Sequence, residues 1–297
     1  MNTQVEAGDL VARKSHNNDI LFKVIDIKDA DKGKHALLRG VDVRLFADAP
    51  LEDLVKKSPS EISKMRQECI KKNSEAMRRI FERRVEDKTR VVLRGEPLNM
   101  SLMRSESELE HFEIPGAVLH IDGDKDYLDL CKATYSQLNI KVHGVQVDEE
   151  KQPEVVMDYL KEYKPHIVVL TGHDGILKNA TDFKDINSYR NSRYFVEAVQ
   201  KAREYEPGRD DLIIIAGACQ SHYEELIAAG ANFASSPLRV LIHAFDPVFI
   251  VEKLAYSSIY DTLAVQDIIA NTITGLDGLG GIETRGCMRL GYPRSPY

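Results

Sequence analysis

Short, wholly apolar runs separated by amphipathic stretches constrain the fold of this chain more than any other feature of its sequence. "IVVL" (residues 167–170) and "LIII" (residues 212–215) contain no polar residue. Such runs are typical of strands that are buried on both faces of a parallel sheet, and amphipathic stretches between them are typical of crossover helices. We therefore predict an α/β fold with strands over 117–121, 140–147, 167–170 and 212–216, and helices over 125–138, 153–163 and 188–204.

The first 56 residues follow a different pattern. Short runs of alternating polarity at 10–13, 20–27, 35–39 and 41–47 are separated by turn-forming residues, which predicts a small SH3-like β-barrel over residues 1–56. Apolar residues then recur at helical spacing, and Lys56 to Arg94 contains thirteen Lys and Arg against six Asp and Glu. We predict a basic helical linker over 57–113, which could be an exposed processing site or a solvated helix, and a three-layer α/β domain over 114–297.

Composition excludes several classes of protein. The formal net charge of −7 argues against nucleic-acid binding by the whole chain, and no apolar run approaches the length of a membrane span. The polar N-terminus lacks a signal-peptide pattern, so we expect a cytoplasmic protein with no membrane partner. Four cysteines without metal-ligand spacing predict free thiols, no metal and no cofactor.

Reactive side chains follow the apolar runs, where ligands bind in open parallel sheets. His120, Asp122 and Asp124 end the first run, His173 follows the third and Cys219 follows the fourth. We expect a helix to start within residues 220–224, where its dipole would favour a Cys219 thiolate. We expect His173 to lie within reach as a base. A cation held by Asp122 and Asp124 is an alternative use of this edge.

An apolar strand ending in a histidine motif ("TGHDG") and a later one ending in a cysteine motif ("AGACQSH") resemble the paired markers of caspase-like cysteine peptidases. Together with "GDLVARKS", "HIDGD", "GANFASSP", "HAFDPV" and "GLGGIETRG", they make the whole chain similar to the YabG-type family of sporulation-specific peptidases. The resemblance implies a caspase-like domain, Cys219 as nucleophile, His173 as base, and cleavage after arginine. It also implies spore coat and germination-related proteins as substrates, and a location in the mother-cell cytoplasm and spore coat.

Further site residues follow from this resemblance. Backbone amides of the oxyanion hole are expected among Asp174, Gly175 and Ala218. A carboxylate must bind the guanidinium of the substrate arginine (S1 pocket); the candidates are Asp122, Asp124, Asp174 and Asp246. We place the substrate groove along residues 232–239, including Ser235 and Ser236. Self-cleavage is expected in the linker; the candidate sites are Arg78, Arg79, Arg83, Arg84, Arg90, Arg94 and Arg104.

Two alternatives remain open at this point. The chain could be a binding or assembly protein of the spore coat that uses the α/β part as a scaffold. It could also be an amidotransferase-like cysteine hydrolase, which takes its histidine from further along the chain; His243 with Asp246 would then replace His173. Ser221 stands where that second class has a glycine, two residues after the cysteine, which weakens the second alternative.

Overall fold

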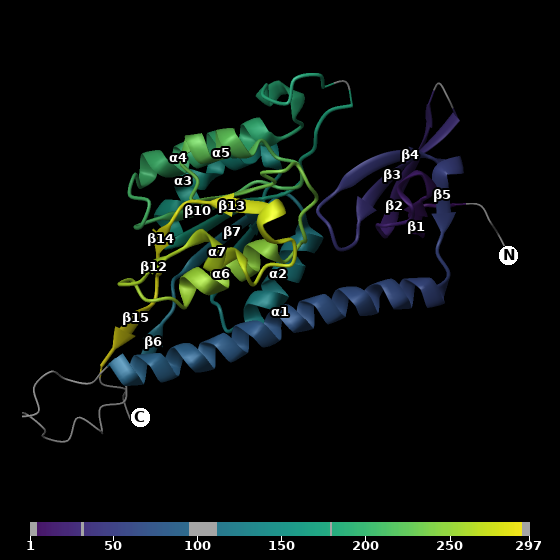
Figure 1. Cartoon of the computed structure of the whole chain (residues 1–297). Helices are drawn as coiled ribbons and strands as arrows, with labels where there is room; N and C mark the ends of the chain where they lie inside the picture. The colour runs from purple at the N-terminus through teal and green to yellow at the C-terminus, as the bar shows by residue number, and fades with distance from the viewer. Residues whose placement is uncertain (1–4, 31–32, 95–111, 179, 293–297) are drawn as a thin grey trace, which may run out of the picture.

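The computed structural model describes residues 5–30, 33–94, 112–178 and 180–292. An N-terminal sheet and a larger α/β body are joined by one long helix (Figure 1). The N-terminal sheet is antiparallel, in the order β4-β3-β2-β1-β5. Its strands are β1 (Leu10–Arg13), β2 (Phe22–Ala30), β3 (Gly33–Gly40), β4 (Phe46–Pro50) and β5 (Leu54–Lys56). We call residues 5–56 the N-terminal sheet domain.

The core of the N-terminal sheet domain contains Val11, Phe22, Val24 and Leu38, all almost inaccessible to solvent. Three of the four predicted strands lie close to observed ones. The fourth, over 41–47, is wrong, because β4 begins only at Phe46. Residues 41–45 leave the sheet as the β3–β4 loop, and Val43 instead forms an isolated antiparallel bridge with His243 of the α/β body.

Helix α1 (Pro59–Arg94) is the predicted basic linker. It runs along the α/β body (Figure 1), where Ala76 and Ile80 are fully buried in the core formed with helices of that body. Arg83 and Arg84 both bind the fully buried carboxylate of Glu252, at 2.7 Å each. The linker is therefore a docked helix whose apolar positions and two arginines attach it to the α/β body.

The α/β body is built on a six-stranded sheet in the order β13-β11-β10-β9-β7-β8. All neighbouring pairs are parallel except β13, which runs antiparallel to β11. The strands are β7 (Val118–Asp122), β8 (Val142–Gln146), β9 (Ile167–Thr171), β10 (Ile213–Ala216), β11 (Phe233–Ser235) and β13 (Leu279–Gly281). The four predicted strands of this body are thus confirmed to within a few residues.

Helices cover both faces of this sheet, which gives three layers (Figure 1). One face packs against α3 (Gln152–Tyr163), α4 (Ser192–Tyr205) and α5 (Tyr223–Ala229). The other packs against α2 (Lys125–Gln137), α6 (Asp246–Ala255) and α7 (Val265–Ile269). The predicted α/β class with a parallel sheet is confirmed, and the predicted helices match α2, α3 and α4, although α4 begins later than expected.

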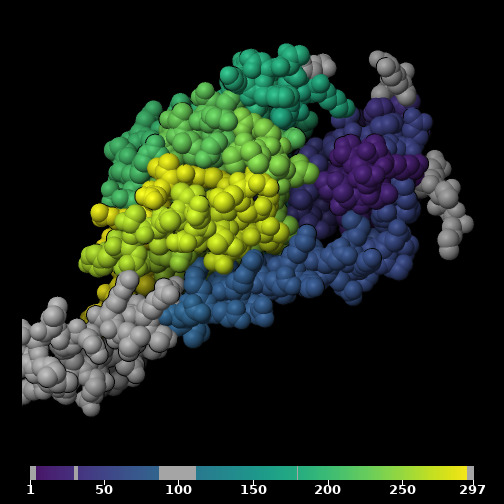
Figure 2. Space-filling model, in the orientation of Figure 1, coloured from purple at the N-terminus to yellow at the C-terminus, as the bar shows by residue number. Residues whose placement is uncertain are grey.

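Short antiparallel pairs complete the body. β6 (Phe112–Ile114) pairs with β15 (Arg289–Gly291), and β12 (Thr262–Leu263) pairs with β14 (Thr284–Arg285). The N-terminal sheet domain abuts the body (Figure 2), and Arg39 of β3 binds Asp124 and Asp126 there. No helix in the described ranges is long and apolar enough to cross a membrane.

Candidate active site

Three neighbouring strands end at one edge of the parallel sheet and carry the predicted site residues. Asp122 is the last residue of β7, His173 follows β9, and Cys219 follows β10. β9 lies between the other two strands and pairs with both in parallel register. The prediction that His173 and Cys219 follow adjacent strands is confirmed, and Asp122 lies on the far side of His173 from Cys219 in the strand order.

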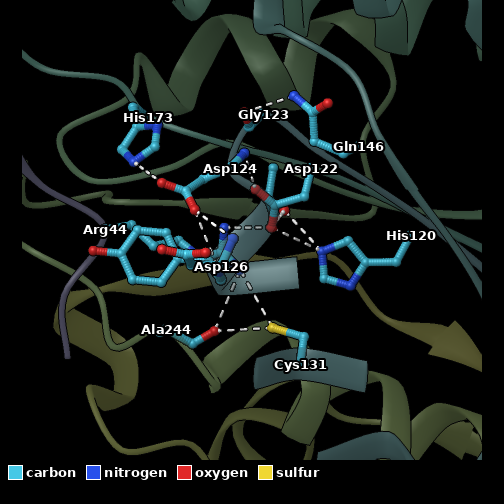
Figure 3. Close-up of polar contacts among 12 residues, drawn as sticks. Arg44, His120, Asp122, Gly123, Asp124, Asp126, Cys131, Gln146, His173 and Ala244 are labelled. Carbon is cyan, nitrogen blue, oxygen red and sulfur yellow. Dashed lines mark hydrogen bonds and ion pairs between the residues drawn. The ribbon is translucent and has the colours of Figure 1, made fainter. Parts of the chain in front are cut away.

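His173 lies between two carboxylates. Its Nδ1 is 3.3 Å from Oε1 of Glu149. Its Nε2 is 3.3 Å from Oδ2 of Asp124 (Figure 3). Burial lowers the pKa of His173, but hydrogen bonding and attraction from Asp124 and Glu149 outweigh it, so the net pKa is raised. The backbone N–H of His173 also donates to Glu149 at 2.6 Å. Glu149 therefore fixes both the backbone and the ring of His173.

Two glycines allow Glu149 to reach this position. Glu149 begins the short helix η5 (Glu149–Lys151) after β8. A Cβ at Gly172 would lie 2.3 Å from Oε1 of Glu149, and one at Gly123 would lie 2.2 Å from the same atom. Neither glycine has a positive φ, so it is the space for this carboxylate, and not backbone freedom, that requires glycine at both positions.

Cys219 is fully buried. Its Sγ accepts a hydrogen bond from the amide of Ile242 at 3.3 Å. The backbone of Arg44 lies near enough to the sulfur to lower the pKa of the thiol slightly. The predicted helix start within residues 220–224 is confirmed, since α5 begins at Tyr223. Burial raises the pKa of the thiol to about 12, against the predicted thiolate. The thiol is therefore protonated in this arrangement, and no hydrogen bond joins it to His173 among the described residues.

Asp122 binds the guanidinium of Arg44 (Figure 3). Nη1 of Arg44 is 2.5 Å from Oδ2 of Asp122, and both side chains are completely buried. Nη2 of Arg44 lies 3.3 Å from the thiol of Cys131 and 3.5 Å from the carbonyl oxygen of Ala244. The attraction of Arg44 keeps the pKa of Asp122 well below its usual range despite burial. The carboxylate at the end of β7 thus pairs with an arginine side chain in the interior of the protein.

The carboxylate of Asp122 is oriented by its own neighbours. Its Oδ2 accepts from the hydroxyl of Thr171 at 2.9 Å, and its Oδ1 accepts from the backbone N–H of Asp124 at 2.9 Å. His120 is also buried beside it, and its Nε2 contacts the Thr171 hydroxyl at 2.8 Å. The charge of Asp122 is therefore held in place by groups of the sheet itself.

The other three S1 candidates have different partners. Asp124 caps the N-terminus of α2, accepting from the amides of residues 126 and 127, and binds Arg39. Asp174 accepts hydrogen bonds from the hydroxyls of Ser192 and Ser221 and from the amide of Gly175. Asp246 accepts from the amides of His243 and Ile273 and from the hydroxyl of Thr274. Among the four candidates, Asp122 is the one that holds an arginine in a buried pocket.

The amides expected in the oxyanion hole are not equivalent. That of Ala218 donates to the Ser221 hydroxyl at 2.9 Å, and that of Gly175 donates to the Asp174 side chain at 2.8 Å. The amide of Asp174 makes no hydrogen bond in the described part of the chain. Ser235 and Ser236 of the predicted groove are both buried. The hydroxyl of Ser236 accepts a hydrogen bond from the amide of Gln220 and so stabilises the turn after Cys219.

His243 belongs to a second thiol–imidazole pair. Its Nε2 is 3.6 Å from Sγ of Cys69 on α1, beside a cavity of about 290 Å³ that Asp42 also lines. Burial, assisted by Lys72 and Arg44, lowers the pKa of His243 to about 4, and burial raises that of Cys69 to about 12. Both groups are therefore neutral near pH 7, and the ring of His243 faces Cys69.

No group of three or more His, Cys, Asp or Glu side chains among the described residues could hold a metal ion. The two carboxylates of the alternative cation site, Asp122 and Asp124, instead bind Arg44 and Arg39.

The candidate self-cleavage arginines lie on α1, apart from Arg104, which falls outside the described residues. Arg78 and Arg79 are exposed, whereas Arg83 and Arg84 are held by Glu252. Arg90 and Arg94 belong to the last turns of the helix. Cleavage at any position on α1 requires that part of the helix to unwind, because peptidases read extended backbone.

Comparison with known proteins identifies the family. The family model for YabG peptidase U57 matches residues 6–293. The chain belongs to the YabG peptidase family. It is 43% identical over 301 residues to the sporulation-specific protease YabG of Bacillus subtilis (strain 168), with 98% of each chain covered. The resemblance inferred from the sequence is confirmed. Because the YabG family model extends from residue 6, it includes the N-terminal sheet domain as well as the α/β body.

Three residues of the site escaped the sequence analysis of this YabG-family chain. Glu149 follows β8, so applying the strand-end rule to that strand as well would have found it. Arg44 lies in a stretch that alternates like a strand, which concealed the loop. Tyr127 of α2 donates from its hydroxyl to the carbonyl oxygen of Val43 at 2.7 Å; a buried tyrosine at a helical core position gives no sequence signal for such a contact.

Proposed function

We propose that this YabG-family peptidase is a cysteine endopeptidase of sporulation that cleaves proteins after arginine. Cys219 is the nucleophile, His173 is the base, and Asp122 binds the substrate arginine in a caspase-like catalytic domain. Spore coat and germination-related precursor proteins are the proposed substrates, in the mother cell and the spore coat. The name of the Bacillus subtilis relative, a sporulation-specific protease, supports the biological setting.

The buried pairing of Arg44 with Asp122 is the observation that carries the proposal. A guanidinium is a planar fork that is recognised by carboxylates, and a buried Asp in this position favours a cation over other side chains. The backbone of the same arginine lies near the sulfur of Cys219, where it acts to lower the pKa of the thiol. An arginine whose side chain reaches Asp122 therefore has its main chain beside the proposed nucleophile, which is the arrangement that cleavage after arginine requires.

The chemistry proposed for these groups is acyl transfer. His173 accepts the proton of the Cys219 thiol, and Sγ attacks the carbonyl carbon of the substrate arginine. The amide of Asp174 donates to the developing oxyanion, since the neighbouring amides of Gly175 and Ala218 already have acceptors. The C–N bond then breaks, the imidazolium gives its proton to the leaving amine, and water hydrolyses the thioester. Glu149 and Asp124 hold the ring and stabilise the imidazolium.

Self-cleavage in the linker is part of this proposal. Arg78 and Arg79 are the described candidates with exposed side chains, while the arginines bound to Glu252 anchor the helix. The intact masses of wild type and Cys219→Ala after prolonged incubation test this point. Loss of a fragment at a linker arginine in wild type alone is expected, and equal masses would contradict it.

Turnover of a peptide series tests the main proposal. Peptides with Arg, Lys, Asp or Ala before the scissile bond are offered to wild type and to four variants, each checked for folding by circular dichroism. Cleavage after Arg should disappear in Cys219→Ala and His173→Ala and survive in His243→Ala. Asp122→Asn should lose the preference for Arg while keeping its thiol. Activity that depends on His243 and not on His173 would overturn the proposed dyad.

A further inference from the structure

The β3–β4 loop lies in the candidate active site in the manner of a bound peptide. Val43 forms an antiparallel bridge with His243, and the amide of Ala244 donates to the carbonyl oxygen of Asp42 at 3.1 Å. Strand addition of this kind is a common way in which proteins hold an extended peptide. Asp42 and Val43, which precede Arg44, are therefore paired with His243 and Ala244. In the proposed site, the substrate residues before the cleaved bond would lie along the same segment.

Residues on the other side of Arg44 continue the same path. The ring of Phe46 packs on the ring of His173, with 4.2 Å between their centroids. A general acid that protonates the leaving amine must lie near the residues after the cleaved bond. The loop thus runs from the paired segment at His243, through the arginine pocket at Asp122, to the imidazole, in the direction expected of a substrate.

Hydrogen bonds keep the loop from adopting the extended form of a substrate at its centre. The amide of Leu45 donates to the carbonyl oxygen of Val43 at 2.8 Å, which closes a γ-turn at Arg44. The carbonyl oxygen of Leu45 accepts from Gly40 at 2.8 Å, so both ends of the loop are tied to the N-terminal sheet. The hydroxyl of Tyr127, on α2 of the α/β body, also donates hydrogen bonds to the carbonyl oxygens of Gly40 and Val43.

We infer that the β3–β4 loop, residues 41–45, is an internal inhibitor that fills the arginine pocket of this peptidase and must withdraw before a substrate can bind. The inference rests on the proposed function, because it takes the Asp122 pocket as the arginine subsite. It assigns the N-terminal sheet domain a regulatory role. The turn at Arg44 and the anchored ends explain why this loop blocks the site without being cut.

Burial of the nucleophile agrees with this state. Cys219, Asp122 and Arg44 are all inaccessible to solvent, so a second arginine cannot enter while the loop is in place. Arg39 adds a second attachment at the same interface, through Asp124 and Asp126. Withdrawal of the loop therefore has to break ion pairs as well as backbone hydrogen bonds.

Removal of the Arg44 side chain tests the inference in the full-length protein. We compare wild type, Arg44→Ala and the exposed-cation control Lys28→Ala in two assays. The first is cleavage of a short fluorogenic arginyl peptide. The second is the shift in Tm on adding Nα-acetyl-argininamide, which does not depend on catalysis. Because apparent affinity falls with the fraction of open sites, Arg44→Ala should raise kcat/KM at least about tenfold.

The two assays separate this inference from the proposed function. In the second, the ligand should raise the Tm of Arg44→Ala, leave that of wild type and Lys28→Ala unchanged, and have no effect on Arg44→Ala/Asp122→Asn. If no variant cleaves the peptide but this pattern of Tm shifts is seen, the proposed peptidase activity is wrong. The inference that Arg44 occupies an arginine-binding site at Asp122 is then still supported. Equal kcat/KM in wild type and Arg44→Ala, with no difference in Tm shift, overturns the inhibitor.

A second variant covers the case in which Arg44→Ala leaves Asp122 unpaired and fails to fold. Tyr127→Phe removes the hydroxyl that holds the loop and leaves the Arg44–Asp122 pair intact. It should raise the rate at which an arginyl chloromethyl ketone alkylates Cys219, measured by intact mass. An unchanged rate in a folded Tyr127→Phe protein counts against the inhibitor. Cleavage between Arg44 and Leu45 in wild type but not in Cys219→Ala would make the loop a substrate and also overturn it.

Discussion

The pKa of His173 should fall when Glu149 is replaced by glutamine. Oε1 of Glu149 is 3.3 Å from Nδ1 of His173, and its charge helps to raise the pKa of the buried imidazole. An opposite charge at this range shifts a pKa by about 1 to 3 units. Asp124 remains on the other nitrogen at 3.3 Å, so we expect the lower end for Glu149→Gln, about 1 unit, or about 1.4 kcal/mol.

The pKa is best measured without relying on catalysis. In a Cys219→Ala background, the ring Cε1–H resonance of His173 is followed against pH by NMR and assigned through its loss in His173→Gln. Glu150→Gln is the matched control, because it removes the same charge from the next, exposed residue. A pKa of His173 that stays the same or rises in Glu149→Gln would refute the electrostatic role assigned to Glu149. In the active enzyme, the acid limb of kcat/KM should move to lower pH.

Three further outcomes are expected. Gly172→Ala should displace Glu149 and lower peptide turnover more than the free energy of unfolding. Glu252→Ala removes the buried carboxylate that binds Arg83 and Arg84 and should destabilise the protein by about 3 kcal/mol in urea denaturation. The pKa of His243 is lowered to about 4, so the unfolded chain binds more protons and stability is lost as pH falls from about 6.5 to 4, by on the order of 3 kcal/mol. His243→Gln should flatten that dependence.

The α/β body was predictable because its signals are local. Buried strands such as β9 and β10 are continuous apolar runs. In the helices between the strands, apolar residues recur every three to four positions, as expected of an amphipathic helix. Parallel strands present their carboxyl ends on one edge, so His173, Asp122 and Cys219 could be placed near one another from the sequence. The exact starts of helices were harder to predict, since α4 begins at Ser192 and not at residue 188 as expected.

The contact between the two parts of the chain could not be read from the sequence. Residues 41–47 alternate in polarity, and alternation predicts a strand without naming its partner. Here the partner of Val43 is His243, which lies in the other part of the molecule. The burial of Arg44 is likewise a tertiary effect, because an arginine is ordinarily exposed unless a buried carboxylate such as Asp122 pairs with it.

Withdrawal of the β3–β4 loop from the site would explain why the protein contains the buried Arg44–Asp122 ion pair. Two charges removed from water are at best a weak source of stability, and an apolar pair of the same volume often stabilises a core as well or better. Under the proposed function, Asp122 must later bind the arginine of a substrate, so it cannot be replaced in that way. It needs a cation whenever the site is closed, since an unpaired buried charge is strongly destabilising. An arginine supplied by the N-terminal sheet domain meets both needs, because it neutralises Asp122 in the closed state and can be exchanged for a substrate arginine of the same charge and shape.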